Sequence, residues 1–500
     1  MSEAQRAVVE VDPVEVGNVV AGELRMDGDV VEVSNPGRLD EPAGTYRSAT
    51  PLLVDEAARA ARAAQRRWSA LTPRDRVPVL ETIAARIEAN ADQLGRILAA
   101  EAGIPVAQAI AEAIGAAGAF RNSAEMLVDV TGTDEIEVAT GGRIRVGRRP
   151  IGLVACIVPW NAPLGLAAQK LAPAIATGNG VLLKPSPLAP LAVTTLATVV
   201  AGELPAGLVN IVNGGGDVGA ALIDHPLVRK VSFTGGGATA RAIMSSAAQT
   251  LKKVHFELGG NDPAIVLDDA DLGLSAQRIV ASAFRRAGQI CYAVKRVYVP
   301  ETRYAAFAER LEDEIAAVAV GDSFDPRTTM GPLSSRAQLD FVAGLADRAR
   351  ESGREVRVGG VALDAEGWNN GHFLKPAWVP DAAPDDELVG TEQFGPLLPV
   401  VRYRTIDEAI DLANDSEYGL GSSIWTSDPE RALSVAERIE AGVTFVNNHV
   451  LSRAGFRHIP FGGLKQSGMG WENSPAGLEE YLEFHSIDIH PIYSNGEGRR

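Results

Sequence analysis

The first third of the chain carries the hydrophobic pattern of helices. In the segment VLETIAARIEANADQLGRIL, Leu80, Ile83 and Ile87 are spaced by three and four residues, and the apolar stripe continues at positions 94, 97 and 98. This spacing is typical of amphipathic helices that pack on one side. We therefore expect an alanine-rich helical region over about residues 54–126.

From about residue 129 the pattern changes to strict alternation. The stretches EIEV and RIRV alternate polar and apolar residues and are separated by Gly-Gly, which predicts a hairpin or a pair of exposed strands. The tail at 479–490 alternates in the same way. Because an isolated hairpin has little stability of its own, this projecting β element is expected to need another surface to cover it.

Short, mostly apolar runs separated by helical segments follow in the middle of the chain. The four clearest runs lie at 151–159, 180–185, 207–212 and 230–235. Runs of this kind suit strands buried on both faces of a parallel sheet, with crossover helices between them. Cys156 lies within the first run and is interpreted as a core residue.

A second α/β set begins near residue 260. It includes a strand at 295–299 and a helix at 303–320. The expected fold class is therefore α/β, with two α/β domains and the projecting β element. Chain length points the same way, because 500 residues exceed what one ordinary core accommodates.

Composition and charge narrow the range of partners. Apolar residues make up 46% of the chain and the formal net charge is −17, so nucleic acid and anionic membranes are not expected partners. Two cysteines and seven dispersed histidines favour a reducing compartment and predict no structural metal site. The N-terminal segment MSEAQRAVVEVDPVEVGNVV resembles neither a signal peptide nor a membrane span. A cytoplasmic protein is expected.

Two glycine clusters follow predicted strands. NGGGDVGAAL contains a GxGxxG pattern that starts at Gly214, and FTGGGATAR contains a GxGxxA pattern that starts at Gly235. Glycines at a strand-to-helix turn let backbone amides approach a pyrophosphate. Neither pattern is followed by an obvious acidic ribose ligand, so a nucleotide is expected but an ordinary dinucleotide fingerprint is not established.

Cys291, in AGQICYAV, is either a small buried hydrophobe or a nucleophile. A thiolate attacks an aldehyde carbon when a base or a positive environment activates it. The resulting alkoxide needs fixed N–H donors, and Asn161 in VPWNAP together with the Cys291 amide can supply them. Glu257, at the end of a predicted strand in HFELGGND, can activate the water that releases the acid.

Six stretches in a fixed order carry a resemblance to a known family. VPWN, FTGG, FELGGNDP, GQICYAVKR, EQFGP and PFGGLKQSG together resemble the aldehyde dehydrogenase superfamily, in its non-acylating, NAD(P)-dependent branch. The 34-residue separation of Glu257 and Cys291 also matches the family. The resemblance implies a Rossmann-like dinucleotide-binding domain (1–128 and 150–257), a catalytic domain (258–462) and an oligomerisation arm (129–149 and 478–491).

The resemblance also implies a role for each matching residue. Cys291 becomes the nucleophile that forms a thiohemiacetal and then a thioester, Glu257 the general base, and Asn161 the oxyanion donor. The expected cofactor contacts are Trp160, Lys184, Ser186, Pro187, Gly214, Gly235, Gly236, Leu258, Glu392 and Phe394. The expected partners are a small aldehyde and further copies of the chain, as a homodimer or homotetramer.

The chain departs from the family pattern at the cofactor. Many members that prefer NAD have a glutamate where this chain has Pro187, and its loss makes a 2′-phosphate tolerable. Nothing basic beyond Lys184 obviously binds that phosphate, so NAD or NADP is expected, with NAD favoured. Gly236 replaces a frequent serine, so phosphate contacts there would come from backbone amides.

The substrate side gives mixed signals. Tyr292 is expected to narrow the aldehyde tunnel, and Arg285 lies where the succinate-semialdehyde branch has an arginine for the distal carboxylate. The second arginine of that branch is Gln169 here. The loop that carries His449 also brings Arg453, Arg457 and His458 towards the expected tunnel mouth. These side chains either favour a polar or anionic aldehyde or are the charges of a solvated surface loop.

Two other functions compete with aldehyde oxidation to the free acid. In a CoA-acylating semialdehyde dehydrogenase CoA resolves the thioester, but that branch lacks the glutamate that Glu257 supplies. A non-catalytic binding or structural protein would gain nothing from a reactive thiol. Three neighbouring residues are interpreted without a catalytic role, His255 as packing and Arg286 and Lys295 as solvated or paired surface charges.

Overall fold

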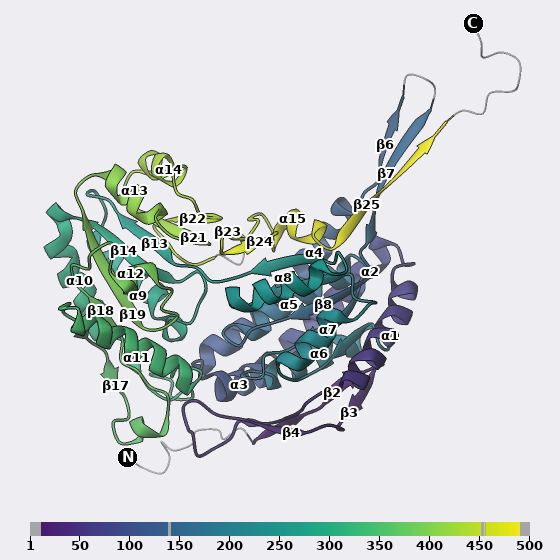
Figure 1. Ribbon diagram of the computed structural model, residues 1–500, viewed down its shortest axis with the longest axis horizontal. Coiled ribbons are helices and arrows are strands. Elements are labelled where there is room, and N and C mark those ends of the chain that lie inside the picture. Colours follow the sequence, from purple (N-terminus) through teal and green to yellow (C-terminus); the bar gives the residue numbers. More distant parts are fainter. Residues whose placement is uncertain (1–11, 139–141, 452–454, 456, 491–500) are drawn as a thin grey trace, which may run out of the picture.

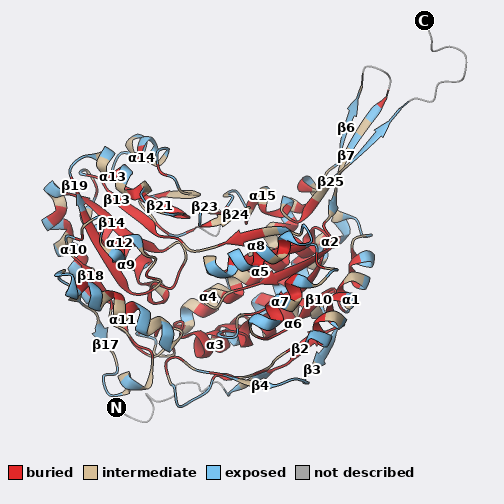
Figure 2. Cartoon of the chain, in the orientation of Figure 1, coloured by how far each residue is buried: buried red, intermediate tan, exposed pale blue. Residues whose placement is uncertain are grey.

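Two lobes and a projecting arm make up the computed structural model, which describes residues 12–138, 142–451, 455 and 457–490. Each lobe is built around one large sheet with helices on both faces, and the arm extends away from the lobe that contains α1 to α8 (Figure 1). Figure 2 shows that the strands inside the two lobes are buried, whereas the arm is largely exposed. The predicted α/β fold class is confirmed.

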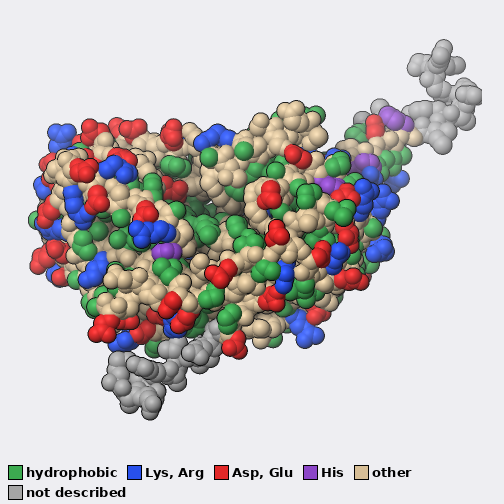
Figure 3. Space-filling view, turned by 60° about the horizontal axis from the view of Figure 1, so that its bottom comes forward, with side chains coloured by type: hydrophobic (Ala, Val, Ile, Leu, Met, Phe, Trp, Pro, Cys, Tyr) green, Lys and Arg blue, Asp and Glu red, His purple; other side chains and the backbone are tan. Residues whose placement is uncertain are grey.

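Charges of both signs are spread over the surface. On the face in Figure 3, acidic and basic side chains lie close together, and hydrophobic side chains gather near the middle. No helix among the described residues is long and apolar enough to span a membrane.

The first large sheet is mostly parallel and contains a topological switch point. Among the described residues its strand order is β24-β12-β11-β8-β9-β10-β2-β3. The central strands β12 to β10 are parallel, and the strand order reverses between β8 and β11. Ligands of such sheets bind beyond the carboxyl ends of the strands at this point. The strands are β2 (Asn18–Val20), β3 (Glu23–Arg25), β8 (Leu153–Ile157), β9 (Gly180–Lys184), β10 (Val209–Ile211), β11 (Lys230–Thr234), β12 (Lys253–Glu257) and β24 (Gly468–Met469).

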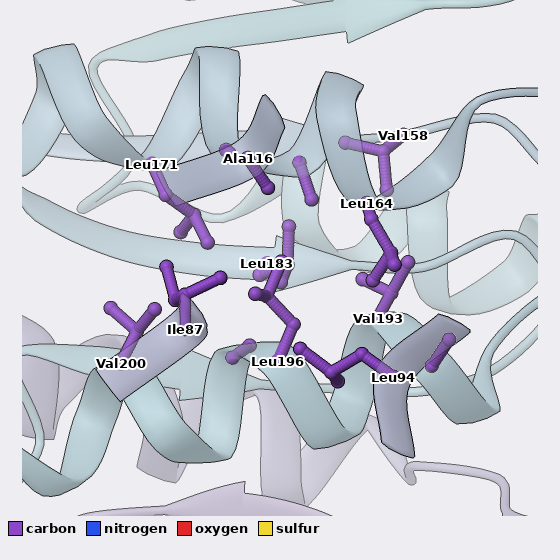
Figure 4. Close-up of a cluster of buried hydrophobic side chains, with 14 of the residues drawn as sticks. Ile87, Leu94, Ala116, Val158, Leu164, Leu171, Leu183, Val193, Leu196 and Val200 are labelled. Carbon is purple, nitrogen blue, oxygen red and sulfur yellow. The ribbon is translucent and has the colours of Figure 1, made fainter. Parts of the chain in front are cut away.

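Helices cover both faces of this sheet because its strands are apolar on both sides. Along β8, Val154 and Cys156 join the core beneath α2 to α6, whereas Leu153, Ala155 and Ile157 join the core beneath α1, α7 and α8. Figure 4 shows Leu183 of β9 among leucines and valines of α5 and α6. The helices are α1 (Pro51–Trp68), α2 (Pro73–Ala89), α3 (Ala91–Ala102), α4 (Val106–Val130), α5 (Pro163–Ala176), α6 (Leu191–Gly202), α7 (Gly216–Asp224) and α8 (Gly237–Ala248).

The helical region follows the predicted apolar stripe, with one break. The side chain of Thr72 caps α2 in a capping box with Asp75. The stripe then passes from α2 to α3 at Asn90, where one helix ends and the next begins. Both halves of the stripe are buried, and the helical region predicted over about 54–126 is divided among α1, α2, α3 and α4.

The second large sheet has the order β16-β18-β19-β14-β13-β21-β22 and is parallel except at β16. Residues of α9 and α10 contribute to the core on one face and residues of α11 to α14 to the core on the other. Its strands are β13 (Asp262–Val266), β14 (Val294–Pro300), β16 (Arg357–Val358), β18 (Ala377–Val379), β19 (Leu397–Tyr403), β21 (Gly421–Trp425) and β22 (Val443–Val446). Its helices are α9 (Leu272–Ala283), α10 (Tyr304–Ala316), α11 (Arg336–Glu351), α12 (Glu387–Gly390), α13 (Ile406–Asn414) and α14 (Pro429–Ala436).

The arm is an antiparallel sheet of the order β25-β7-β6. The predicted hairpin pairs β6 (Asp134–Glu137) with β7 (Arg143–Pro150), and the alternating tail pairs with β7 as β25 (Leu482–Ile489). The start of the expected arm segment, at 129, still belongs to α4, and position 491 lies outside the described residues. The division of the chain into functional domains remains a prediction.

Smaller elements complete the fold. The predicted helix at 303–320 ends at Ala316 and is followed by a short strand. The segment before residue 50, for which no strands were predicted, contains β2 and β3 and all three strands of a separate sheet of the order β1-β5-β4. The remaining elements are β1 (Val14–Val16), β4 (Val30–Val33), β5 (Gly44–Arg47), β15 (Ala319–Val320), β17 (Val361–Ala362), β20 (Tyr418–Gly419), β23 (Leu464–Lys465), α15 (Ser474–Glu479) and the 3-10 helices η2 (Arg285–Gly288), η3 (Glu301–Arg303) and η4 (Gly367–Asn370).

Candidate active site

Cys291 lies in the turn that leads from η2 into β14. Three successive residues before it, Arg286, Ala287 and Gly288, have positive φ angles of 54°, 54° and 75°. A Cβ on Gly288 would lie 2.3 Å from the carbonyl oxygen of Gly395, so only glycine permits this close approach. The turn leaves Cys291 partly exposed at the junction of two cavities.

Asn161 follows β8 at the switch point and lines the same two cavities as Cys291. It is buried, and its Nδ2 donates to the carbonyl oxygen of Gln289, 2.9 Å away. An amide nitrogen carries two hydrogens, so one remains to donate to a group beside Cys291. The structure thus brings Asn161 and Cys291 together, as predicted.

Glu257 ends β12 and is buried behind this junction. Within the described part of the chain neither of its carboxylate oxygens has a hydrogen-bond partner. Burial raises its pKa well above the usual range, and the charge of Glu472 raises it further, while Lys170 lowers it. Glu257 is not among the described residues that line the two cavities at Cys291, but its charge acts on the Cys291 thiol and raises the pKa of that thiol.

The Gly-Gly pair after Glu257 brings two other site elements close to β12. A Cβ on Gly259 would lie 2.2 Å from Oε2 of Glu392, and one on Gly260 would lie 2.7 Å from the carbonyl oxygen of Cys291. Glu392 also accepts a hydrogen bond from the Gly260 amide at 3.1 Å. The pair therefore lets a carboxylate and the cysteine turn pack against the end of the strand.

The thiol of Cys291 is in an environment that favours its neutral form. Burial raises its pKa to about 12, and the ammonium of Lys295 acts in the opposite direction. Lys295 Nζ donates to the carbonyl oxygens of Ile290 and Cys291 at 2.9 and 3.1 Å, and lies 3.3 Å from Glu392. The nucleophile thus requires a proton acceptor when it reacts.

One cavity of about 450 Å³ begins at Cys291 and runs between the two lobes. The rings of Trp160 and Phe394 meet edge to face across it, with centroids 5.6 Å apart. Its lining includes six of the predicted cofactor contacts, Trp160, Gly235, Gly236, Leu258, Glu392 and Phe394.

A second cavity of about 460 Å³ continues along the carboxyl ends of β8, β9 and β11. Helix α8 begins at Gly237, directly after Gly235 and Gly236 in its wall, and a helix N-terminus favours an anion. Lys184, Ser186 and Pro187 lie in the same wall. An elongated cavity with glycines, a helix N-terminus and one lysine fits a dinucleotide.

Gly214 does not line this cavity and is the exception among the predicted cofactor residues. It is buried with φ 150°, whereas the next glycines of its pattern, Gly215, Gly216 and Gly219, form the wall. A Cβ on Gly214 would lie 2.4 Å from Val218, so Gly214 serves the turn, and its contact with the cofactor stays a prediction.

A third cavity of about 420 Å³ approaches Cys291 and Asn161 from the other side. Tyr292, Arg285 and Gln169 all line it, as expected for a substrate tunnel. Much of the remaining wall is small or apolar, with Ala111, Gly115, Ala119, Gly165, Leu166 and Leu451. Cys291 therefore lies between a dinucleotide-sized cleft and a separate tunnel.

Comparison with known proteins agrees with this geometry. The model of the aldehyde dehydrogenase family matches residues 25–487. The chain belongs to the aldehyde dehydrogenase family. An aldehyde dehydrogenase from Brucella melitensis biovar abortus 2308 is 34% identical over 95% of this chain and 97% of its own, with a TM-score of 0.90.

Solved relatives of this aldehyde dehydrogenase include an enzyme in complex with NAD+ and an enzyme that depends on NADP. Betaine aldehyde dehydrogenase from Staphylococcus aureus in complex with NAD+ is 31% identical, covers 96% of this chain and 97% of its own, and has a TM-score of 0.91. An NADP-dependent enzyme from E. coli is 34% identical, covers 95% of this chain and 98% of its own, and has a TM-score of 0.90. Solved relatives with about the same similarity to this chain thus include both an NAD+ complex and an NADP-dependent enzyme.

His449 does not reach the tunnel of this aldehyde dehydrogenase, contrary to the prediction. Its side chain is fully buried, with Nε2 2.7 Å from the carbonyl oxygen of Tyr292 and 3.4 Å from Asp262. His449 thus holds the turn after Cys291 and makes no part of the tunnel wall among the described residues. Arg457 pairs with Glu125 at the surface, and Arg453 lies outside the described residues.

Arg286 and Lys295 are buried, so their interpretation as surface charges is wrong for both. Arg286 donates to the carbonyl oxygen of Asn161 at 2.7 Å and to Glu112 at 2.6 Å. Lys295 stabilises the Cys291 turn as described above. Arg286 thus hydrogen-bonds the backbone of Asn161, and Lys295 that of Cys291. Their carboxylate partners, Glu112 and Glu392, are distant in the sequence, so no local pattern predicts these pairs.

Sequence reasoning also missed a buried ion pair next to Glu257. Lys170 Nζ donates to Oε1 of Glu472 at 2.7 Å, and both side chains are almost completely buried. The two residues are 302 positions apart, so neither spacing nor periodicity could have paired them. The charge of Glu472 raises the pKa of Glu257, and the charge of Lys170 lowers it.

Proposed function

We propose that this aldehyde dehydrogenase oxidises an aldehyde to the free carboxylic acid, with NAD(P) as hydride acceptor. The observation that carries the proposal is the position of Cys291. Its side chain lines both a dinucleotide-sized cleft and a separate tunnel, and Asn161 lines both beside it. An aldehyde from the tunnel and a dinucleotide in the cleft would meet at this thiol.

In the first step the sulfur of Cys291 adds to the aldehyde carbon and the carbonyl oxygen becomes an alkoxide. The second amide hydrogen of Asn161 and the backbone amide of Cys291 donate to that oxygen. Because burial favours the neutral thiol, its proton passes to solvent water as the S–C bond forms. When bound, a nicotinamide dinucleotide supplies the hydride acceptor that takes the carbon to the oxidation level of a thioester.

In the second step water hydrolyses the thioester. Glu257 takes a proton from the water, whose oxygen adds to the thioester carbon, and the C–S bond then breaks. The products are the free acid and the thiolate of Cys291. The presence of Glu257 at the end of β12 favours this route over transfer of the acyl group to CoA.

NAD is the proposed nucleotide, with NADP tolerated. Pro187 places no carboxylate against a 2′-phosphate, but the cleft also lacks a clear basic clamp among its described lining residues. Lys184 is buried, its pKa is lowered to about 8 by that burial, and its Nζ donates to the carbonyl oxygen of Pro185 at 3.0 Å. A lysine held in this way supports a ribose contact better than a phosphate contact.

Absorbance at 340 nm tests the reaction directly. Purified protein is mixed with NAD or NADP and with aliphatic, aromatic and ω-carboxylated aldehydes. Formation of reduced nucleotide with any class supports the proposal, and a preference for carboxylated aldehydes assigns Arg285 as their anchor. Turnover only after CoA is added would favour the acylating reaction, and undiminished turnover after Cys291→Ala would contradict the mechanism.

We also propose self-association through the arm. Phe484 and Ile136 on its strands are 72% and 52% exposed, and Ile487 and Ile489 are about 40% exposed. Large apolar side chains that lie exposed together on one small sheet are typical of an interface. A single monomer mass in solution, measured by light scattering, would contradict it.

A further inference from the structure

A chain of buried polar side chains lies behind Glu257 and has no part in the steps above. In the parallel pair β11 and β12, Ser232 is opposite His255 and Thr234 is opposite Glu257. Ser232 Oγ is 3.0 Å from Nδ1 of His255 and 3.1 Å from the hydroxyl oxygen of Tyr481. Ser232, His255 and Tyr481 are all at least 98% buried.

The hydrogen-bond capacity of these groups gives the chain a direction. The Tyr481 hydroxyl has one proton to donate, and its hydrogen-bond partner within the described part of the chain is Ser232 Oγ. The Ser232 hydroxyl then donates its own proton to Nδ1 of His255. Nδ1 is therefore an acceptor, and in a neutral imidazole the proton sits on Nε2.

The proton on Nε2 points at the candidate base. Nε2 of His255 lies 3.8 Å from Oε1 of Glu257. Both atoms are buried and without a hydrogen-bond partner within the described part of the chain. A displacement of the carboxyl by about 1 Å brings the two atoms to an ordinary hydrogen-bond distance. A donor at this distance favours the ionised carboxylate over the acid.

The charged groups around the pair keep the imidazole neutral. Burial lowers the pKa of His255 well below its usual range, and the ammonium groups of Lys170 and Lys230 lower it further. Lys170 pairs with Glu472 and Lys230 with Glu480. These groups, with Tyr481 and the buried Cys156, are the titratable neighbours of the pair. A neutral His255 can donate to Glu257 but does not take its proton.

We propose that His255 is a positioning residue for thioester hydrolysis. Ser232 and Tyr481 hold it as the Nε2–H tautomer, and it donates to Glu257 so that the buried carboxyl ionises and can accept a proton from water. His255 itself gains and loses no proton in the step. The inference rests on the proposed function of Glu257 and Cys291, and it replaces the interpretation of His255 as packing.

An activated ester separates this role from the rest of the reaction. p-Nitrophenyl acetate acylates a reactive thiol without nucleotide and without knowledge of the natural aldehyde. A burst of p-nitrophenol measures acylation of Cys291, and the later steady rate measures hydrolysis of the acyl-enzyme. Both rates are recorded between pH 5 and pH 9 for the full-length protein and its variants.

Two variants of His255 form a matched pair. His255→Asn keeps an acceptor for Ser232 but has no donor that reaches Glu257, whereas His255→Gln carries an amide nitrogen about as far as Nε2. Without the donor the pKa of Glu257 rises, so the acid limb of the steady rate moves up by about one to two pH units. At pH 7 we expect about a tenfold or larger loss in His255→Asn, less than about threefold in His255→Gln, and an unchanged burst in both.

The tautomer itself is read by ¹⁵N NMR of protein labelled at histidine. The signal that disappears in His255→Asn belongs to His255, and a protonated Nε2 is expected. Tyr481→Phe keeps the ring and the backbone bond to Asn179 but removes the hydroxyl, so the tautomers should mix and the steady rate should fall about two- to fivefold.

Each contrary result has a separate meaning. A protonated Nδ1, or a His255→Asn acid limb that coincides with that of the wild type, would overturn the role of His255 while leaving the burst and the proposed function intact. The absence of any burst in the wild-type protein would overturn the nucleophilic role of Cys291 and this inference with it.

Discussion

The two cysteines show how position decides chemistry in this enzyme. Cys156 lies in the middle of β8, fully buried, and Cys291 lies in a turn at the junction of two cavities. Burial raises the pKa of both thiols to about 12. Intrinsic acidity therefore does not distinguish the two. Access to a substrate and to neighbouring donors does.

The two cysteines also differ in the side chains that surround them. Cys156 packs among apolar residues on one face of the first sheet. Cys291 has Lys295 and Asn161 on either side of its turn and a carboxyl, Glu257, behind it. A reactive thiol in this protein thus depends on groups drawn from three strand ends of two different sheets.

Removing the two thiols in turn gives the largest expected contrast. Cys291→Ala should lower aldehyde oxidation by at least about 1000-fold, because the covalent intermediate can no longer form. Binding of NAD, followed by quenching of tryptophan fluorescence, should stay intact because the cleft is unchanged. Comparable turnover in this variant would remove the distinction between the two cysteines.

Glu257→Gln should have the next largest effect. Thioester hydrolysis is expected to slow by about 100- to 10,000-fold because the water loses its base, while one equivalent of reduced nucleotide still forms rapidly. In the wild type the pKa of Glu257 is raised, so the rate of hydrolysis should rise with pH as the carboxyl ionises. A burst that disappears together with the steady rate would assign Glu257 to the first step instead.

Replacing Lys295 tests the electrostatic part of the comparison. The ammonium lowers the pKa of Cys291, so Lys295→Met should raise it and slow alkylation by iodoacetamide at pH 8 by about tenfold or more. Loss of this buried charge also leaves Glu392 without its ion-pair partner, so a lower melting temperature is expected. Unchanged alkylation would show that Lys295 serves only the structure of the turn.

Cys156→Ala should have the smallest effect. We expect activity within about twofold of the wild type and a loss of about 1 kcal/mol in the free energy of unfolding, because a small buried side chain is shortened. Native protein should incorporate one equivalent of a thiol reagent, and unfolded protein two. Native labelling of both thiols would contradict the assignment of Cys156 to the core.

Local sequence patterns predicted the helical region, the parallel strands of the first sheet and the strands of the arm. The apolar runs of the first sheet predict strands that are buried on both faces, and the alternation in the arm predicts strands that are exposed. Asn161 follows β8 and Glu257 ends β12, and these parallel strands place their carboxyl ends at one edge of the first sheet. Cys291 lies in the turn between η2 and β14. The sequence therefore predicts the structure correctly where the residues that determine it are close together in the chain.

The predictions failed where the partner of a charge is distant. Arg286 and Lys295 were expected at the surface, yet Glu112 and Glu392 pair with them from other elements. His449 was expected at the tunnel, yet it is buried against the turn after Cys291. No periodicity records which carboxylate or carbonyl a buried charge will meet, so only the folded chain supplies that information.

Two buried lysines of the first lobe, Lys170 on α5 and Lys230 on β11, have a consequence for the synthesis of the chain. Lys170 and Lys230 meet their carboxylate partners, Glu472 and Glu480, 302 and 250 residues later. An emerging chain that ends before these glutamates would have to bury two uncompensated ammonium groups in order to close the sheet, which is strongly unfavourable. Translation must therefore run almost to the arm before this lobe settles, and a ribosome-bound nascent chain should stay sensitive to protease until then.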